Sequence, residues 1–148
     1  MKNLLSQLFL ITTLLVSGNS EAQQSQDFGD YVVHYNALTT NFITPEVAKA
    51  YAIKRSSSRV LINITLLKKV MNNPGTPVKA KVKASGTNLT GQLREIAIRE
   101  IKDTEGAIYY IGEFQVHNLE TYKFAVEVLP AGEEEPLMVK FQQQFYTE

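Results

Sequence analysis

The sequence predicts an all-β protein, a single two-sheet sandwich of about seven short strands with one short helix after the first strand. Apolar and polar residues alternate in short stretches along the chain, and clusters of Gly, Pro, Asn and Asp separate these stretches. Such alternation is typical of strands that bury one face and expose the other. The chain has 148 residues, of which 44% are hydrophobic. This length favours one domain, and the composition is sufficient for a core.

The residue types of the predicted strands fit the positions that a sandwich requires. In the second strand Ile62 and Ile64 share one face, and β-branched residues suit a pleated sheet. In the third strand Lys79, Lys81 and Lys83 lie opposite the apolar face, as expected at a sheet edge or on a solvated face. The predicted strands are residues 30–37, 59–68, 78–84, 92–102, 107–116, 121–129 and 137–145.

Residues 92–102 fit both an amphipathic helix and a strand. We interpret them as a strand, with a bulge where the alternation slips, because a tight-turn sequence at 103–106 and a clear strand follow them. We expect residues 23–26 to be a loose polar leader and residues 72–75 to be a turn. The inward faces of the central strands predict a buried core that contains Ile62, Ile64, Phe124, Val126 and Phe141.

Residues 45–51, between the first two strands, are predicted to form the short helix. Thr44 suits the N-cap, and Pro45 occupies the first helical position, where its missing N–H costs nothing. A helix of this length is not stable alone, because isolated helices below about 12 residues are marginal. We therefore expect it to dock on the sandwich through Val47 and Tyr51, which lie on the same helical face.

Residues 1–22 are predicted to be a cleavable signal peptide, and residues 23–148 the sandwich domain. Lys2 begins a short basic region, an apolar stretch follows at 4–16, and a small, polar region ends at Ala22. The apolar stretch of about 13 residues is shorter than the roughly 20 that cross a bilayer. The alternative is a short membrane anchor. We expect export to a bacterial periplasm, with no stable membrane insertion after cleavage.

The composition excludes several kinds of chemistry. The chain has no Cys, and its 15 basic and 15 acidic residues give no net charge. Disulfides, thiol nucleophiles and cysteine metal sites are therefore excluded, and a nucleic-acid partner is not expected. His34 and His117 do not form a metal-ligand pair in the sequence, and no serine lies in a nucleophile motif. We expect no enzymatic activity, no cofactor and no metal site.

The segment 28–55 carries the functional hypothesis, because it concentrates aromatic, His and Asn side chains typical of recognition surfaces. We expect a protein-binding or accessory module whose partner is another periplasmic or envelope protein. One alternative is that these aromatics only cover the open end of the sandwich. A second is a metal or small-ligand carrier that uses His34 or His117. The candidate partner-binding residues are Tyr31, His34, Asn36, Glu46, Lys49 and Arg55.

One short stretch of the sequence resembles a known kind of sandwich. Residues 119–126 resemble the start of strand F in immunoglobulin-type and fibronectin-type domains. This resemblance implies an immunoglobulin-like or fibronectin-like sandwich in which the hydroxyl of Tyr122 bonds to the backbone.

A second resemblance covers most of the chain after residue 22. Residues 28–37, 43–51, 53–56 and 107–110 resemble a family of small periplasmic proteins of Gram-negative bacteria that is named only as a domain of unknown function, DUF4426. The resemblance implies export and a β-rich fold, and it brings no activity or site residue. Ala52 stands where the resemblance leads us to expect Gly after Tyr51.

Overall fold

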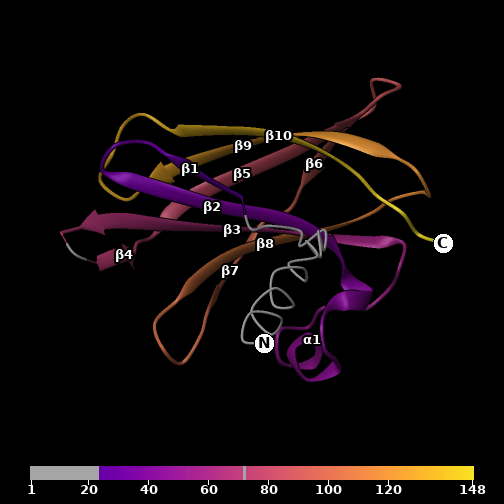
Figure 1. Cartoon of the computed structure of the whole chain (residues 1–148), viewed down its shortest axis with the longest axis horizontal. Coiled ribbons are helices and arrows are strands. Elements are labelled where there is room, and N and C mark those ends of the chain that lie inside the picture. Colours follow the sequence, from indigo (N-terminus) through magenta and orange to yellow (C-terminus); the bar gives the residue numbers. More distant parts are fainter. Residues whose placement is uncertain (1–23, 72) are drawn as a thin grey trace, which may run out of the picture.

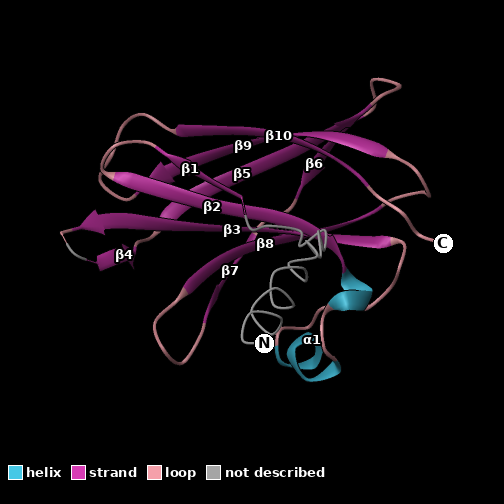
Figure 2. Cartoon of the chain, in the orientation of Figure 1, coloured by secondary structure: helices cyan, strands magenta, loops and turns pink. Residues whose placement is uncertain are grey.

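The computed structural model describes residues 24–71 and 73–148, so the predicted signal peptide lies outside the described residues. Two antiparallel sheets pack face to face, and the helical segment lies on the side of one sheet that faces away from the other (Figures 1 and 2). This confirms the prediction of an all-β two-sheet sandwich. The described residues form ten strands where about seven were predicted.

The sheet next to the helical segment, here the first sheet, has six strands, and the second sheet has four. The strand order of the first sheet is β1 (Gln24–Asp27), β2 (Tyr31–Thr39), β3 (Arg59–Val70), β8 (Ile108–Gln115) and β7 (Arg99–Lys102), with β4 (Asn73–Pro77) also paired to β3. The order of the second sheet is β10 (Leu137–Gln144), β9 (Thr121–Pro130), β5 (Ala80–Asn88) and β6 (Leu93–Ile96). Between β2 and β3 the chain forms a 3-10 turn, η1 (Thr40–Phe42), and the helix α1 (Pro45–Ala50).

The core lies between the sheets and is dominated by β3 and β9. The predicted burial of Ile62, Ile64, Phe124 and Val126 is confirmed. Phe141 packs against this cluster but is only half-buried, because its strand β10 is at the edge of the second sheet. Its ring stacks on Phe124 with centroids 4.7 Å apart, a geometry that stabilises beyond simple burial.

Two segments predicted to be loops or turns are strands. Residues 24–27 form β1 on the edge of β2, where Gln24 is opposite Tyr35, and β4 takes the place of most of the predicted turn at 72–75. All four β1 residues are exposed, and Asp27 forms an ion pair with Lys69. Backbone pairing and this ion pair hold the strand. It therefore needs no apolar side chains, and its polar composition is the one expected of a loose leader.

Residues 92–102 are two strands instead of the single strand predicted. β6 pairs with β5 in the second sheet, and β7 pairs with β8 in the first, so the chain changes sheets between Ile96 and Arg99. A Cβ atom at Gly112 would lie 2.5 Å from Cγ2 of Ile96 and 2.9 Å from the carbonyl oxygen of Ala97. The crossing therefore requires glycine at this position, and the slip in alternation marks the change of sheet. The predicted hairpin turn between β7 and β8 is confirmed.

The hydroxyl of Tyr122 does not bond to the backbone as the fibronectin-like resemblance implied. It donates to the carboxylate of Glu120 at 3.1 Å, which also accepts from the side chain of Asn88 and the backbone N–H of His117. Burial alone would raise the pKa of Glu120, but these hydrogen bonds outweigh it and hold the pKa below its usual value. The buried tyrosine thus stabilises a side-chain network that joins two turns.

The helix has the predicted start but a different buried face. The Thr44 hydroxyl accepts the backbone N–H of Val47 at 3.4 Å, which confirms the N-cap. Ala48 is buried, whereas Val47 keeps 44% of its surface exposed. The expected burial of Val47 is therefore wrong, because the helix turns Ala48 toward the sheet.

Replacing Phe124 with Ala should lower the free energy of unfolding by about 3–5 kcal/mol, because it empties the centre of the core. Phe42→Ala is the matched control, since Phe42 is 73% exposed, and it should cost less than about 0.5 kcal/mol. Urea denaturation of both variants measures the difference. A loss below about 1 kcal/mol for Phe124→Ala would show that the inward face of β9 has been assigned wrongly.

Candidate functional site

A groove lies on the outer face of the first sheet, beside the segment of residues 40–58. It encloses about 310 Å³. Its floor consists of sheet side chains, chiefly Leu38, Leu61, Ile101, Tyr109 and Ile111, and its wall consists of Ile43, Val47, Tyr51 and Ile53 from the segment. Asn63 and Asp103 are the polar members of the lining.

A second, smaller core anchors this wall. Leu61 and Ile111 point away from the main core, yet they are only 5% and 4% exposed. Ala48 of α1 is 4% exposed on the same side of the sheet. The outer face of the first sheet is therefore partly covered by the segment, and the groove is the part of this apolar surface that stays open.

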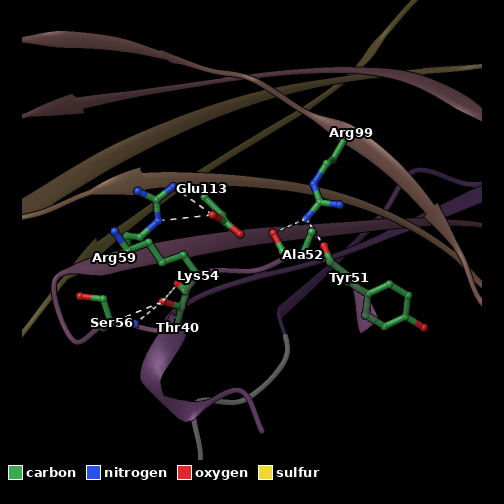
Figure 3. Close-up of polar contacts among 8 residues, drawn as sticks. All are labelled: Thr40, Tyr51, Ala52, Lys54, Ser56, Arg59, Arg99 and Glu113. Carbon is green, nitrogen blue, oxygen red and sulfur yellow. Dashed lines mark hydrogen bonds and ion pairs between the residues drawn. The ribbon is translucent and has the colours of Figure 1, made fainter. Parts of the chain in front are cut away.

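A buried threonine lies where the segment of residues 40–58 leaves β2. Thr40 is fully buried, and its hydroxyl donates to the carbonyl of Lys54 at 2.8 Å while it accepts the backbone N–H of Ser56 at 2.9 Å (Figure 3). A single side chain thus joins the two ends of the segment that connects β2 and β3.

Two arginines hold the rest of the segment by its backbone carbonyls. Arg55 donates to Ile43 at 2.7 Å and to Asn41 at 2.9 Å. Arg99, which lies on β7, donates to the carbonyls of Tyr51 and Ala52 (Figure 3). Hydrogen bonds from a charged donor are stronger than neutral ones. The segment is therefore tied both to itself and to the edge of the first sheet.

Three acceptors on the outer face of this sheet have no hydrogen-bond partner among the described residues. They are Oδ1 of Asn36, Oδ1 of Asn63 and Oε1 of Glu113, and all three atoms are buried. Asn36 and Asn63 are directly opposite each other on β2 and β3. The other oxygen of Glu113 accepts from Arg59 at 3.0 Å (Figure 3). A buried acceptor without a partner costs about 1–3 kcal/mol.

Comparison with known proteins places this architecture in a family. The family described as "Domain of unknown function (DUF4426)" matches residues 25–148. The chain belongs to the DUF4426 family. A DUF4426 protein of Pseudomonas aeruginosa PAO1, whose crystal structure was solved at 2.09 Å resolution, is 33% identical, with a TM-score of 0.74. The match covers 85% of this chain and 96% of the Pseudomonas chain. No curated protein matches the sequence.

The six predicted partner-binding residues of this DUF4426 domain separate into three groups. His34 and Asn36 lie on the outer face of β2, and Glu46 and Lys49 are exposed on α1, on the same side of the sheet. Tyr31 lies on the opposite face, where its ring packs against the core and its hydroxyl donates to Glu133 at 3.0 Å. Arg55 holds the backbone of its own segment.

The groove residues Leu61 and Ile111 were missed in the sequence, although a signal for them is present. Residues 60–62 are three consecutive apolar residues, and such runs are typical of strands buried on both faces. Only even-numbered residues of β3 were predicted to be buried, so its outer apolar face was not predicted.

The described residues hold no group of three or more His, Cys, Asp and Glu side chains arranged to bind a metal ion. His34 is on β2, and the backbone of His117 bonds to Glu120 in the turn before β9. No helix in the described part of the chain is long and apolar enough to cross a membrane.

Ala52 has a φ of +53°, a left-handed conformation that favours glycine. This is the position at which the family resemblance led us to expect Gly. A left-handed conformation raises the free energy of the folded state by about 1–2 kcal/mol for a residue with a Cβ. Glycine avoids this cost, but its more flexible unfolded chain lowers the stability of the folded state by about 0.4–1 kcal/mol. Ala52→Gly should therefore stabilise the domain by about 0.5 kcal/mol.

The matched control is Ala50→Gly, two residues earlier at the end of α1. It should destabilise the domain by about 0.5–1 kcal/mol, because glycine weakens a helix. Denaturant midpoints of the two variants should thus shift in opposite directions. Destabilisation by both substitutions would refute the backbone strain at Ala52.

Proposed function

We propose that this DUF4426 domain is an exported binding module of the bacterial envelope that recognises another envelope protein through the groove beside α1. The observation that carries the proposal is an apolar groove on a sheet face that would otherwise be solvated. One face of an antiparallel sheet is usually apolar and the other polar. Here both faces of the first sheet are apolar near Leu61 and Ile111, and the outer one is only partly covered.

The size of the groove favours protein side chains over a large ligand. Pockets that enclose small molecules occupy about 300–1,000 Å³ and bury most of the ligand surface. A volume of 310 Å³ is at the lower end of this range. It suits a few side chains of a partner whose remaining surface rests on the polar rim, where Glu46 and Lys49 are exposed. An apolar centre within a polar rim is the usual composition of protein interfaces.

The rigidity of the wall supports the same proposal. Thr40, Arg55 and Arg99 fix the segment by hydrogen bonds to backbone groups. A preformed surface binds with a smaller entropy cost than one that must be ordered on binding. The export part of the proposal depends on residues 1–22 and on the family resemblance.

Site-specific photo-crosslinking in living Gram-negative cells tests the proposal. A benzophenone amino acid at Val47 should give one discrete adduct with an envelope protein, because Val47 lines the groove and is 44% exposed. The control position is Lys123, an exposed residue of the second sheet, which should give no such adduct. The recovered protein should begin at or near Gln23.

Two results would contradict the proposal. Equal adducts at both positions would show that the groove has no special role. Recovery of the protein from membranes with Met1 still in place would show that residues 1–22 anchor the protein.

A further inference from the structure

We propose that a second site, separate from the groove beside α1, binds an uncharged saccharide. A hollow of about 320 Å³ lies at one end of the sandwich, where it is lined by the ends of β2 and β10, by η1 and by residues 145–148 (Figure 1). The hollow and the groove share no lining residue, so this inference goes beyond the proposed function. Three features of the hollow favour a saccharide: its exposed aromatic rings, its uncharged polar lining and the relative depth of the two.

The first feature is a pair of exposed aromatic rings. Phe42 and Tyr146 are the only exposed Phe or Tyr residues in the part of the chain that the structure describes, with 73% and 61% of their surface accessible. Both line this hollow, although they are far apart in the sequence. The electron-rich face of an aromatic ring attracts C–H groups, and the faces of a sugar ring consist of C–H groups. Two such rings at one hollow therefore favour a ligand of this kind.

Both rings are held in place before any ligand arrives. The backbone at Phe42 is fixed by Arg55, which donates to the carbonyls of the residues on either side of it at 2.9 and 2.7 Å. The ring of Tyr146 is fixed by its hydroxyl, which donates to Oε1 of Gln144 at 3.0 Å. A ring that is already positioned loses less conformational entropy when a ligand stacks on it.

The second feature is a lining of uncharged hydrogen-bonding groups. Asn41, Ser57 and Gln143 contribute amides and a hydroxyl. The amide of Gln143 donates to the carbonyl of Ala37 at 2.9 Å, which fixes the position of its side chain. Amides and hydroxyls both donate and accept hydrogen bonds, and so do the hydroxyl groups of a sugar. Of the described residues that line the hollow, Glu148 alone is charged, and a single exposed carboxylate attracts a cation only weakly.

The third feature favours a saccharide over a protein ligand. Protein interfaces usually have an apolar centre within a polar rim. Here the order is reversed, because Thr39 lies deep in the hollow with 7% of its surface exposed, whereas Phe42 and Tyr146 are the exposed members. Phe145 is also buried, but its ring belongs to the main core. A sugar that stacks on an exposed ring can turn its hydroxyl edge toward the deeper polar groups.

Saturation-transfer NMR on the purified full chain tests the inference with three uncharged probes, maltotetraose, cellotetraose and tetra-N-acetylchitotetraose. At millimolar concentration at least one probe should receive saturation, most strongly at its ring C–H protons. The affinity for that probe should fall about tenfold in Phe42→Ala and in Tyr146→Ala, because each variant loses a stacking contact. Phe42→Tyr, which keeps a ring, should retain the wild-type affinity. Both residues are exposed, so the variants should keep the wild-type melting temperature.

The matched control is Tyr51→Ala, which removes an aromatic ring from the groove beside α1 and should leave the affinity for the saccharide unchanged. A lack of saturation transfer to all three probes, or equal affinity of the wild type, Phe42→Ala and Tyr146→Ala, would overturn the inference and leave the proposed function standing. Loss of binding in Tyr51→Ala alone would place the saccharide in the groove and overturn both. A benzophenone amino acid at Phe42 that captures one discrete envelope protein in cells would identify a protein as the occupant and overturn the inference.

Discussion

The attachment of residues 40–58 to the outer face of the first sheet is the constraint on which the candidate site depends. This segment contains two short helical elements, η1 and α1. Neither is long enough to be stable alone. Its position is set by Ala48 against the apolar floor and by hydrogen bonds of Thr40, Arg55 and Arg99. Without this attachment the floor would be an exposed apolar sheet face, and no groove would exist.

This attachment also explains why the domain has two apolar layers. The main core between the sheets stabilises the sandwich, with Phe124 and Ile62 at its centre. The outer layer of Leu61, Ile111 and Ala48 is smaller, and Leu61 and Ile111 line the groove. Unpaired acceptors at Asn36 and Asn63 are costly in a layer that serves only stability.

The sequence predicted most of the central strands, because those strands bury side chains and therefore alternate. It did not predict β1, whose exposed polar residues are held by backbone pairing and by the ion pair of Asp27 with Lys69. It also did not predict the change of sheet after Ile96, which depends on the missing side chain of Gly112. Part of the candidate site was predictable. His34 and Asn36 share a face, whereas Tyr31 is an odd number of residues from His34 and so lies on the other side of β2. The role of Arg55 was not predictable, since a charged loop residue gives no sign that it bonds to its own backbone.

Hydrogen exchange of an Arg99→Met variant tests the central claim most directly, with Lys102→Met on the same strand as the control. If Arg99 ties the wall to the first sheet, the amide of Ile53, which donates to the carbonyl of Ala48 at 2.8 Å, should exchange about tenfold faster in Arg99→Met. The amide of Val126 in β9 and all amides of the control should keep their wild-type rates. Unchanged exchange at Ile53, or faster exchange throughout the domain, would contradict a wall that Arg99 ties to the first sheet.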